Sequence, residues 1–173
     1  MISAIVCVDE FGGIGKDGNL LFDIPNDKKS FKNITQNSTV IMGRKTWDSL
    51  PYKPLPNRLN IVISNTKHGV HNNALFVNLD EIKTILMNSN ANDYFYIIGG
   101  ERIYNELFDF CSCIYLTYVH DKKEADAFFP IEKIDEKEWT IFARSKEYDF
   151  DGIKYEFINF ERLGEKNEKI ETI

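Results

Sequence analysis

Cysteine is scarce in this sequence, and its few copies are poorly placed for a crosslink or a metal site. The 173 residues include only Cys7, Cys111 and Cys113. An odd number of cysteines without C-x-x-C spacing argues against a disulfide framework and against a structural zinc site. The three histidines form no ligand cluster with them, so we expect no metal. A domain of this length buries roughly 70% of its unfolded surface and needs no such crosslink.

Long apolar runs and an excess of positive charge are missing too. The first apolar run, residues 2–8, has no basic segment before it, and Asp9 and Glu10 follow at once. This arrangement is typical of a buried strand and not of a signal peptide. No stretch approaches the roughly 20 apolar residues of a membrane span. The net charge of -6 argues against nucleic acid or an anionic membrane as the main partner. We therefore expect a cytoplasmic protein that binds neither.

Repeats and low-complexity linkers are also absent, which indicates a single domain. Short apolar runs alternate with helical patterns, as in an α/β fold. The expected strands are 3–8, 39–42, 59–64, 75–77, 94–98 and 114–120. The expected helices are 25–35, 44–50, 80–87 and 101–108. A hairpin signal at 149–152 lies between two further expected strands, 139–147 and 154–160, which would be added antiparallel at the sheet edge. The charged tail, 162–173, is expected to be partly frayed.

Three long loops interrupt this pattern, at 9–23, 51–57 and 65–73. The first contains four glycines, but its segment 12–16 lacks the spacing of a phosphate-binding loop and of the dinucleotide-binding G-x-G-x-x-G. Long glycine-bearing loops in compact domains are usually functional or mobile. We therefore expect 9–23 to be a flexible lid.

A single acid lies on the apolar stripe of the first expected helix. Pro25 suits a first helical position, where its missing N–H costs nothing. Asp27, Phe31 and Ile34 then follow at i, i+4 and i+7, on one face. Burying an unpaired charge is costly, so two interpretations are open. Asp27 is either a surface acid steadied by the helix N-terminus, or a carboxylate at the bottom of a pocket that binds a cationic or amidine-like ligand.

Three arginines follow turns that could present them to a ligand. Arg44 and Arg102 each lie in the first turn of a helix that begins after glycine, where free N–H groups can bind anions. Two such turns favour one ligand with several phosphates; the alternative is two ordinary turns with solvated arginines. Arg58 follows the stiff segment 55–57, which suits bidentate binding of a carboxylate unless Arg58 is only a surface residue.

Taken together, these residues resemble the dihydrofolate reductase family from residue 1 to about residue 160. The matching pieces stand in the family's order: Ile14-Gly15 and Leu20 in the lid, Ile24-Pro25-Asn26-Asp27, Phe31, the turn 42–47, Leu55-Pro56-Asn57-Arg58, Ile98-Gly99-Gly100 with Tyr104, Leu116-Thr117, and Asp126 before Phe129-Pro130. The resemblance implies a single-domain α/β fold over 1–161. That fold has a central eight-stranded, mostly parallel sheet with an antiparallel C-terminal hairpin strand and four flanking helices.

The resemblance also implies an activity: NADPH-dependent reduction of 7,8-dihydrofolate to 5,6,7,8-tetrahydrofolate in one-carbon and thymidylate metabolism. Hydride would pass to pterin C6 and a proton to N5. Partners would be dihydrofolate and folate analogues, and the protein would be a monomer. Two alternatives stay open, a riboflavin-pathway reductase of the same fold and a cofactor-binding protein without turnover.

By the same resemblance, the two Asp27 oxygens would pair with pterin N3 and the 2-amino group, Thr117 would support Asp27, and Arg58 would hold the glutamate α-carboxylate. The implied catalytic residues are Asp27, Leu20, Phe22 and Thr117. The implied substrate-binding residues are Ile5, Cys7, Asp27, Phe31, Lys32, Leu50, Lys53, Leu55, Arg58 and Thr117. No metal ligand is implied.

For the cofactor, Ile98 and the backbone of Cys7 would face the nicotinamide. Thr46, Gly99, Gly100 and Arg102 would cradle the pyrophosphate, and Arg44, Ser64 and Lys67 would take the 2′-phosphate. The full implied set is Cys7, Ile14, Gly15, Gly18, Asn19, Gly43, Arg44, Lys45, Thr46, Ser64, Asn65, Lys67, Ile98, Gly99, Gly100, Glu101, Arg102, Ile103 and Tyr104.

The sequence departs from the family pattern at a few positions. Leu21 and Phe22 stand where Pro-Trp is usual, and Phe22 cannot donate the hydrogen bond by which the tryptophan holds an ordered water. Lys28 replaces a commonly apolar residue beside the site, and Asn65 replaces a frequent serine or threonine.

Overall fold

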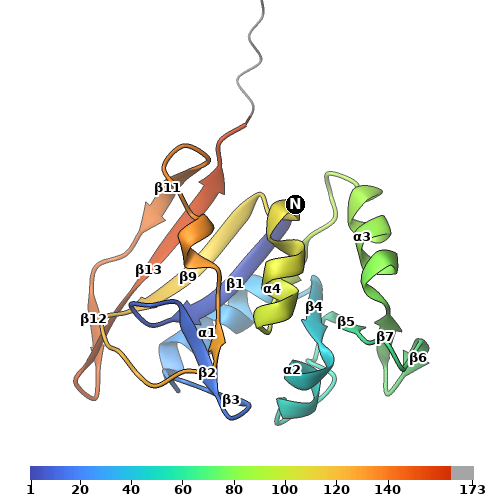
Figure 1. Cartoon of the computed structure of the whole chain (residues 1–173), viewed down its shortest axis with the longest axis horizontal. Coiled ribbons are helices and arrows are strands. Elements are labelled where there is room, and N and C mark those ends of the chain that lie inside the picture. Colours follow the sequence, from blue (N-terminus) through green and yellow to red (C-terminus); the bar gives the residue numbers. More distant parts are fainter. Residues whose placement is uncertain (165–173) are drawn as a thin grey trace, which may run out of the picture.

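One twisted sheet runs through the molecule, and the computed structural model describes it within residues 1–164 (Figure 1). Ten strands of that region pair in this sheet, with nine in the order β11-β13-β9-β1-β8-β4-β5-β7-β6 and β12 added to β13. The strands are β1 (Ile2–Val8), β4 (Thr39–Gly43), β5 (Leu59–Ile63), β6 (Gly69–His71), β7 (Ala74–Val77), β8 (Phe95–Ile97), β9 (Cys113–Val119), β11 (Trp139–Arg144), β12 (Tyr148–Phe150) and β13 (Ile153–Arg162).

The predicted α/β fold with a mostly parallel central sheet is confirmed. The six strands from β9 to β7 in that order pair parallel, and β13, β11, β12 and β6 pair antiparallel. All eight expected strands form, and β6 and β12 make the sheet two strands larger. Each of these two has only three residues, too few to show an alternating apolar pattern.

Four α-helices lie in the described region, as predicted: α1 (Pro25–Thr35), α2 (Arg44–Ser49), α3 (Leu79–Met87) and α4 (Glu101–Leu107). Pro25 is at the start of α1, where the sequence predicts it. Asn78 caps α3, because its side chain accepts the Glu81 N–H over 2.9 Å while the Glu81 carboxylate accepts the Asn78 N–H. Two 3₁₀ turns, η1 (Phe108–Phe110) and η2 (Ile131–Lys133), complete the helical elements.

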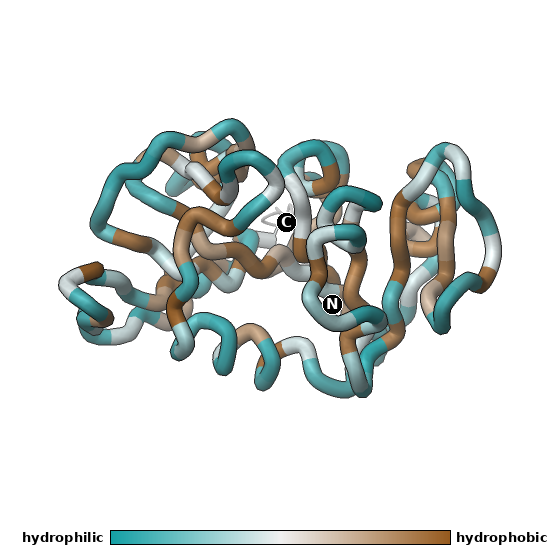
Figure 2. Tube along the Cα trace, turned by 90° about the horizontal axis from the view of Figure 1, so that it is seen from below, coloured by the Kyte–Doolittle hydropathy of each residue, from teal (hydrophilic) through white to brown (hydrophobic). Residues whose placement is uncertain are grey.

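The two faces of the sheet carry separate apolar clusters. Successive strand residues point to opposite faces, so in β1 the side chains of Ala4 and Val6 pack with those of α3 and α4. Ile5 lies between them in sequence and packs on the other face, with Ile34 of α1 and Trp47 of α2. Figure 2 shows hydrophobic residues along the central segments and hydrophilic ones along the outer loops. The helices are therefore divided between the faces, α3 and α4 against α1 and α2.

The lid differs from the sequence expectation. Residues 9–23 are not an unpaired loop, because β2 (Gly13–Lys16) and β3 (Asn19–Leu20) pair within them. β2 also pairs with β10 (Ala127–Phe128), which makes a separate three-stranded sheet. Local patterns cannot reveal this pairing, because the partner segment lies far along the chain.

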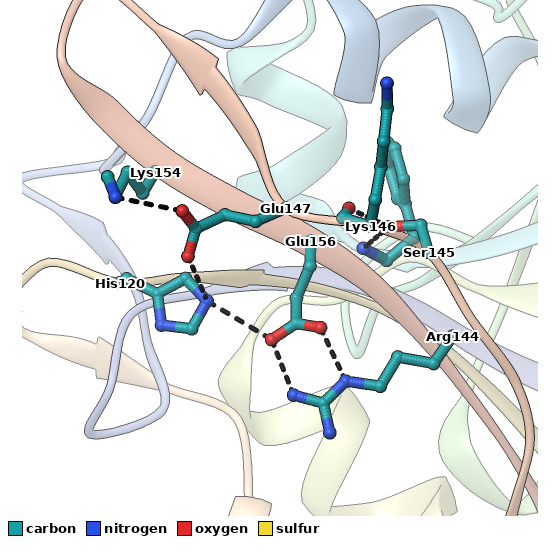
Figure 3. Close-up of polar contacts among 8 residues, drawn as sticks. His120, Arg144, Ser145, Lys146, Glu147, Lys154 and Glu156 are labelled. Carbon is teal, nitrogen blue, oxygen red and sulfur yellow. Dashed lines mark hydrogen bonds and ion pairs between the residues drawn. The ribbon is translucent and has the colours of Figure 1, made fainter.

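A buried carboxylate joins the C-terminal strands. Glu156 of β13 accepts two hydrogen bonds from the Arg144 guanidinium of β11, over 2.6 and 2.8 Å (Figure 3). His120, directly after β9, lies 3.2 Å from the same carboxylate, and Glu147 pairs with Lys154 over 3.0 Å. The Arg144 guanidinium lowers the pKa of Glu156, and His120 adds to this effect. One charge cluster thus ties β9, β11 and β13 together.

The expected frayed tail begins at residue 162, but Arg162 is still part of the sheet. β13 includes Arg162, whose N–H donates to Ser112 and whose guanidinium pairs with Glu138 over 2.8 Å. The rest of the expected tail, 165–173, lies outside the described residues. No helix within residues 1–164 combines the length and the apolar character needed to cross a membrane.

Candidate functional site

Asp27 is the acid at the centre of the candidate site. It lies in the first turn of α1 and is half-buried, as are Phe31 and Ile34 on the same helix face. The Thr117 hydroxyl of β9 donates to Asp27 Oδ1 over 2.6 Å. Burial raises the pKa of Asp27, and the Thr117 hydrogen bond and the Lys28 charge oppose part of that rise. The carboxyl group therefore takes up a proton more readily than an exposed aspartate.

The surroundings of Asp27 are mostly apolar. Cys7 of β1 pairs in register with Thr117, and burial together with the Asp27 charge raises the pKa of its thiol, which stays protonated. Phe22 and Ile24, both buried, precede Asp27 in the chain and pack in one cluster with Cys7 and Leu21. The side chains around the acid thus offer few competing charges.

Tyr104 joins α4 to the backbone of β1 near this point. Its buried hydroxyl donates to the Ile5 carbonyl oxygen over 2.8 Å, and burial raises its pKa. Ile5 itself is half-buried on the α1 face, where Leu50 and Leu55 pack in the same cluster. Three predicted substrate-binding residues, Ile5, Leu50 and Leu55, therefore belong to one apolar surface.

The lid is held by the segment before β10. The Asp126 N–H donates to the Gly15 carbonyl oxygen over 3.0 Å, and Asp126 Oδ2 accepts the Asp17 N–H over 2.9 Å. Lys16 pairs with Glu124 over 2.7 Å. Of the predicted lid residues, Ile14 is half-buried, Gly18 has a φ of +78° in the β2–β3 turn, and Asn19 and Leu20 are exposed. The end of the lid facing solvent therefore includes Leu20, which is 72% exposed.

The two glycine turns lie against each other at the carboxyl ends of the neighbouring strands β4 and β8. β4 and β8 are parallel neighbours, and the Gly43 N–H donates to the Gly99 carbonyl oxygen over 2.7 Å. A Cβ at Gly99, whose φ is +102°, would come within 2.8 Å of the Tyr104 ring. Only glycine fits there without displacing that ring. A Cβ at Gly100 would meet only Thr46 Oγ1, at 3.5 Å, so the space above this turn is open.

The structure thus brings together the residues expected at a pyrophosphate. Thr46 faces Gly100, which caps α4, and Ile103 is the buried residue against Gly43. Glu101 is half-buried, and Lys45 and Arg102 are exposed beside the turns. Ile98 is half-buried, and its N–H donates to the Ile41 carbonyl oxygen.

A third group lies at the next strand end. Gly43 and Ile63 are register partners in β4 and β5, so Arg44 and Ser64 follow paired positions. Ser64 is buried, and its Oγ accepts the N–H groups of Thr66 and Lys67 over 3.2 and 3.0 Å. Arg44, Asn65 and Lys67 are exposed around it. Two cations therefore flank one ordered turn.

Arg58 is held on a short, well-bonded loop. Its guanidinium donates to the Pro56 carbonyl oxygen and to Thr35 Oγ1, each over 3.0 Å, and lies 5.7 Å from the Phe31 ring centroid. Burial lowers its pKa. Asn60, buried in β5, fixes the loop by bonding both the N–H and the carbonyl of Leu55. The sequence does not predict Thr35 or Asn60 as site residues. Asn60 is a polar residue within the apolar run 59–63, whereas Thr35 lies among polar residues and carries no such signal.

The two lysines expected near Arg58 differ in their contacts. Lys32 is exposed on α1. Lys53 donates to the carbonyl oxygens of Trp47 and Asp48, over 3.2 and 2.9 Å, and so caps the end of α2. In this structure the Lys53 ammonium therefore binds the backbone at the end of α2.

Comparisons with known proteins agree on one family. The family model described as dihydrofolate reductase matches residues 1–162. A dihydrofolate reductase of Bacillus subtilis (strain 168) is 33% identical over 171 residues, which cover 95% of this chain and 99% of that protein. The viral dihydrofolate reductase of Saimiriine herpesvirus 2 (strain 488) is 34% identical, covering 94% and 85%. Among solved structures, the Enterococcus faecalis dihydrofolate reductase complexed with NADP(H) and RAB-propyl superposes with a TM-score of 0.80 and 32% identity, covering 94% of this chain and 96% of that one.

Proposed function

Because this chain belongs to the dihydrofolate reductase family, we propose that the region around Asp27 binds the dihydropterin ring and that the two glycine turns bind NADPH. The chain is an NADPH-dependent oxidoreductase that reduces 7,8-dihydrofolate to 5,6,7,8-tetrahydrofolate. The observation that carries the assignment of the site is the Asp27–Thr117 pair, a partly buried acid with a raised pKa among apolar side chains.

Asp27 recognises the pterin through both of its oxygens. The amidine edge of the ring, N3 and the 2-amino group, presents two parallel donors, which match a carboxylate. Thr117 occupies one lone pair of Oδ1 and fixes the rotation of the carboxyl group. The apolar neighbours Cys7, Phe22 and Phe31 lie beside the ring and add no charge that competes for it.

Proton delivery to N5 requires a carrier. Asp27 binds the far edge of the ring and cannot reach N5 itself, so water carries the proton. The raised pKa of Asp27 keeps part of the population protonated closer to neutral pH than an ordinary aspartate would. The lid, ordered by Asp126 against Gly15 and Asp17, limits the entry of further water.

The residues of the glycine turns fit the cofactor. The open space at Gly100, with Thr46 Oγ1 facing it, leaves room for a pyrophosphate to approach the backbone. Arg44, Ser64 and Lys67 supply two cations and a hydroxyl for a 2′-phosphate. The bound nicotinamide supplies the hydride that is added to C6 of the pterin.

Arg58 holds the glutamate α-carboxylate of the substrate. Its guanidinium is preoriented by Pro56 and Thr35, which leaves its remaining N–H groups free to bind a carboxylate in a bidentate manner. Lys32 is exposed in the last turn of α1, the helix that ends at Thr35, and contributes a further positive charge.

A turnover assay tests the proposal. The purified chain should oxidise NADPH when dihydrofolate is added and should do so much more slowly with NADH. A parallel assay with an aminopyrimidine substrate of riboflavin synthesis should give no turnover. Activity with that substrate and none with dihydrofolate would refute the assignment of Asp27 and Arg58 to a folate.

The remaining expectations from the sequence stay predictions. These are a cytoplasmic location, a monomeric state, which the family resemblance implies, and the absence of nucleic-acid or membrane partners, which the net charge of -6 favours. Sedimentation of the purified chain would check the monomeric state.

A further inference from the structure

Lys123 contacts the end of the lid nearest the Asp27 site. Its ammonium donates to the Leu21 carbonyl oxygen over 3.1 Å and lies 4.5 Å from the centroid of the Phe22 ring. Phe22 is only 5% exposed, although it ends a loop. One cation therefore bonds the backbone of the lid end and lies over the ring that packs toward Cys7.

The segment that carries Lys123 is itself fixed at two points. The Lys123 N–H donates to Asp9 Oδ2 over 3.3 Å, and Oδ1 of the same buried carboxylate accepts the N–H groups of Phe11 and Gly13. Asp126 anchors the other end of the segment to Gly15. Both anchors hold the beginning and middle of the lid, and the Leu21 N–H donates to the Ile14 carbonyl oxygen over 3.3 Å. The Lys123 side chain adds a contact from the neighbouring segment to the Leu21 carbonyl oxygen and to the Phe22 ring.

We propose that Lys123 is a positioning residue for dihydrofolate reduction, because its ammonium holds the Leu21–Phe22 end of the lid in place beside the Asp27 site. The inference rests on the proposed function. Lys123 touches neither Asp27 nor the reacting atoms, and it acts through the carbonyl and the ring. Without this contact the lid would remain paired at β2 and β10, and the Leu21 N–H bond to Ile14 would remain, but the Leu21 carbonyl and the Phe22 ring would be less constrained.

The neighbouring Lys122 provides a matched control. Its ammonium lies 4.3 Å from the centroid of the Phe11 ring, the same kind of contact from the same segment. Phe11 is 57% exposed and lies outside the candidate site. Lys122→Met therefore removes an equal charge and an equal type of contact without releasing Leu21 and Phe22.

The variants separate the charge from the packing. Lys123→Met keeps an unbranched side chain and removes the ammonium, and Lys123→Arg keeps a cation able to donate to a carbonyl. Hydride transfer would be measured in a single turnover of the NADPH-bound enzyme mixed with dihydrofolate. Amide hydrogen exchange of residues 20–23 and the thermal unfolding midpoint would be measured alongside.

We expect Lys123→Met to slow hydride transfer by about 3- to 10-fold, less than the loss of a direct charge-assisted contact, because the Lys123 ammonium is exposed and acts on the lid and not on the reacting atoms. The KM for dihydrofolate should change little, exchange at Leu21 and Phe22 should accelerate, and the unfolding midpoint should stay the same. Lys123→Arg should recover most of the rate. In a Phe22→Leu background the effect of Lys123→Met should be smaller, because the ring contact is already lost.

The outcomes distinguish this inference from the proposed function. If wild-type protein reduces dihydrofolate but Lys123→Met matches it in rate and in exchange, the inference is wrong. An equal rate loss in Lys122→Met would also refute it, since the effect would then be one of general charge. If the wild type fails to reduce dihydrofolate, the proposed function fails, and the exchange rates at Leu21 and Phe22 alone decide whether Lys123 holds the lid.

Discussion

The Thr117 hydroxyl donates to Asp27 Oδ1 over 2.6 Å and thereby joins β9 to the first turn of α1. Two opposing effects meet in this contact. Burial favours the neutral form of Asp27 and raises its pKa, whereas the hydrogen bond favours the charged form and lowers it. The balance between them sets how much of the acid is protonated near neutral pH, which makes both residues sensitive points for mutation.

Thr117→Val removes the hydroxyl and keeps a β-branched shape. Because the lost hydrogen bond stabilised the carboxylate, the pKa of Asp27 should rise further, and the decline of hydride transfer with pH should begin at a higher pH. Substrate affinity should fall by about 2- to 10-fold, the worth of one hydrogen bond that orients the carboxylate. Single-turnover rates from acid to alkaline pH would check this. A profile shifted toward acid would contradict the assigned effect of Thr117.

Asp27→Asn should separate activity from stability. Turnover at neutral pH should fall by about 100-fold or more, the scale of a lost acid–base group, and the loss should shrink in acid, where substrate is already protonated. The free energy of unfolding, by contrast, should increase in this variant at neutral pH. The folded-state pKa of Asp27 is raised above 3.8, so its charge disfavours folding once the pH exceeds that value.

The variant should therefore unfold at a higher temperature than the wild type at neutral pH, with the difference disappearing as the pH falls below about 4. Thermal unfolding across this range is the measurement. An asparagine variant with near-normal turnover at neutral pH would remove Asp27 from the mechanism. A variant that is less stable than the wild type at every pH would instead show that burial of the charge carries no cost.

The parts of the fold that the sequence predicts well are those with local signals. The apolar run of β1 and the Pro25 start of α1 lie within a few residues of their expected bounds. The lid sheet was not predictable, because the pairing of Gly15 with Ala127 joins segments that have no local pattern in common. β6 was missed for another reason, since its three residues are all exposed.

In the candidate site, too, the residues with local sequence signals are predicted, whereas contacts between distant segments are not. Gly43, Gly99 and Gly100 stand out in sequence because two strand-to-helix glycine turns are each followed by an arginine, although a single turn of this kind is common in α/β folds. The contact between Arg58 and Thr35 joins α1 to a later loop, and no spacing rule predicts it. Lys53 carries a positive charge that could bind a carboxylate, but in the structure its ammonium donates to the end of α2. The fold of the chain around α2 determines this contact, and the local sequence does not predict it.

Arg44→Ala tests the choice of cofactor. Arg44 follows the register partner of Ile63 and so lies beside Ser64, where a 2′-phosphate would be bound. Losing one charge-assisted contact should weaken NADPH binding by about 10- to 100-fold. NADH binding should stay nearly unchanged, since NADH lacks that phosphate. Equal losses for the two cofactors, measured by fluorescence titration, would place the 2′-phosphate elsewhere.

Arg58→Lys tests recognition of the substrate tail. A lysine keeps the charge but cannot reproduce a planar fork, and it loses either the Thr35 or the Pro56 contact. Binding of dihydrofolate should weaken by about 10-fold, and binding of a dihydropterin without the glutamate should not change. Isothermal titration with both compounds would check this. Equal weakening would mean that Arg58 only supports its loop.

Glu156→Gln tests the charge cluster that Glu156 forms with Arg144 and His120. The Arg144 guanidinium lowers the pKa of Glu156 below 4.5, so the pair stabilises the fold above that pH and ceases to do so as the pH falls through the lowered pKa. The variant should lower the unfolding midpoint by about 2–6 °C at neutral pH, with the gap to the wild type closing in acid. Turnover with dihydrofolate should be unchanged at a temperature where both proteins are folded.

Glu147→Gln is the matched control, because Glu147 is half exposed and pairs with the exposed Lys154, so its loss should cost much less. If the two variants lower the midpoint equally, burial of Glu156 contributes nothing beyond a surface ion pair.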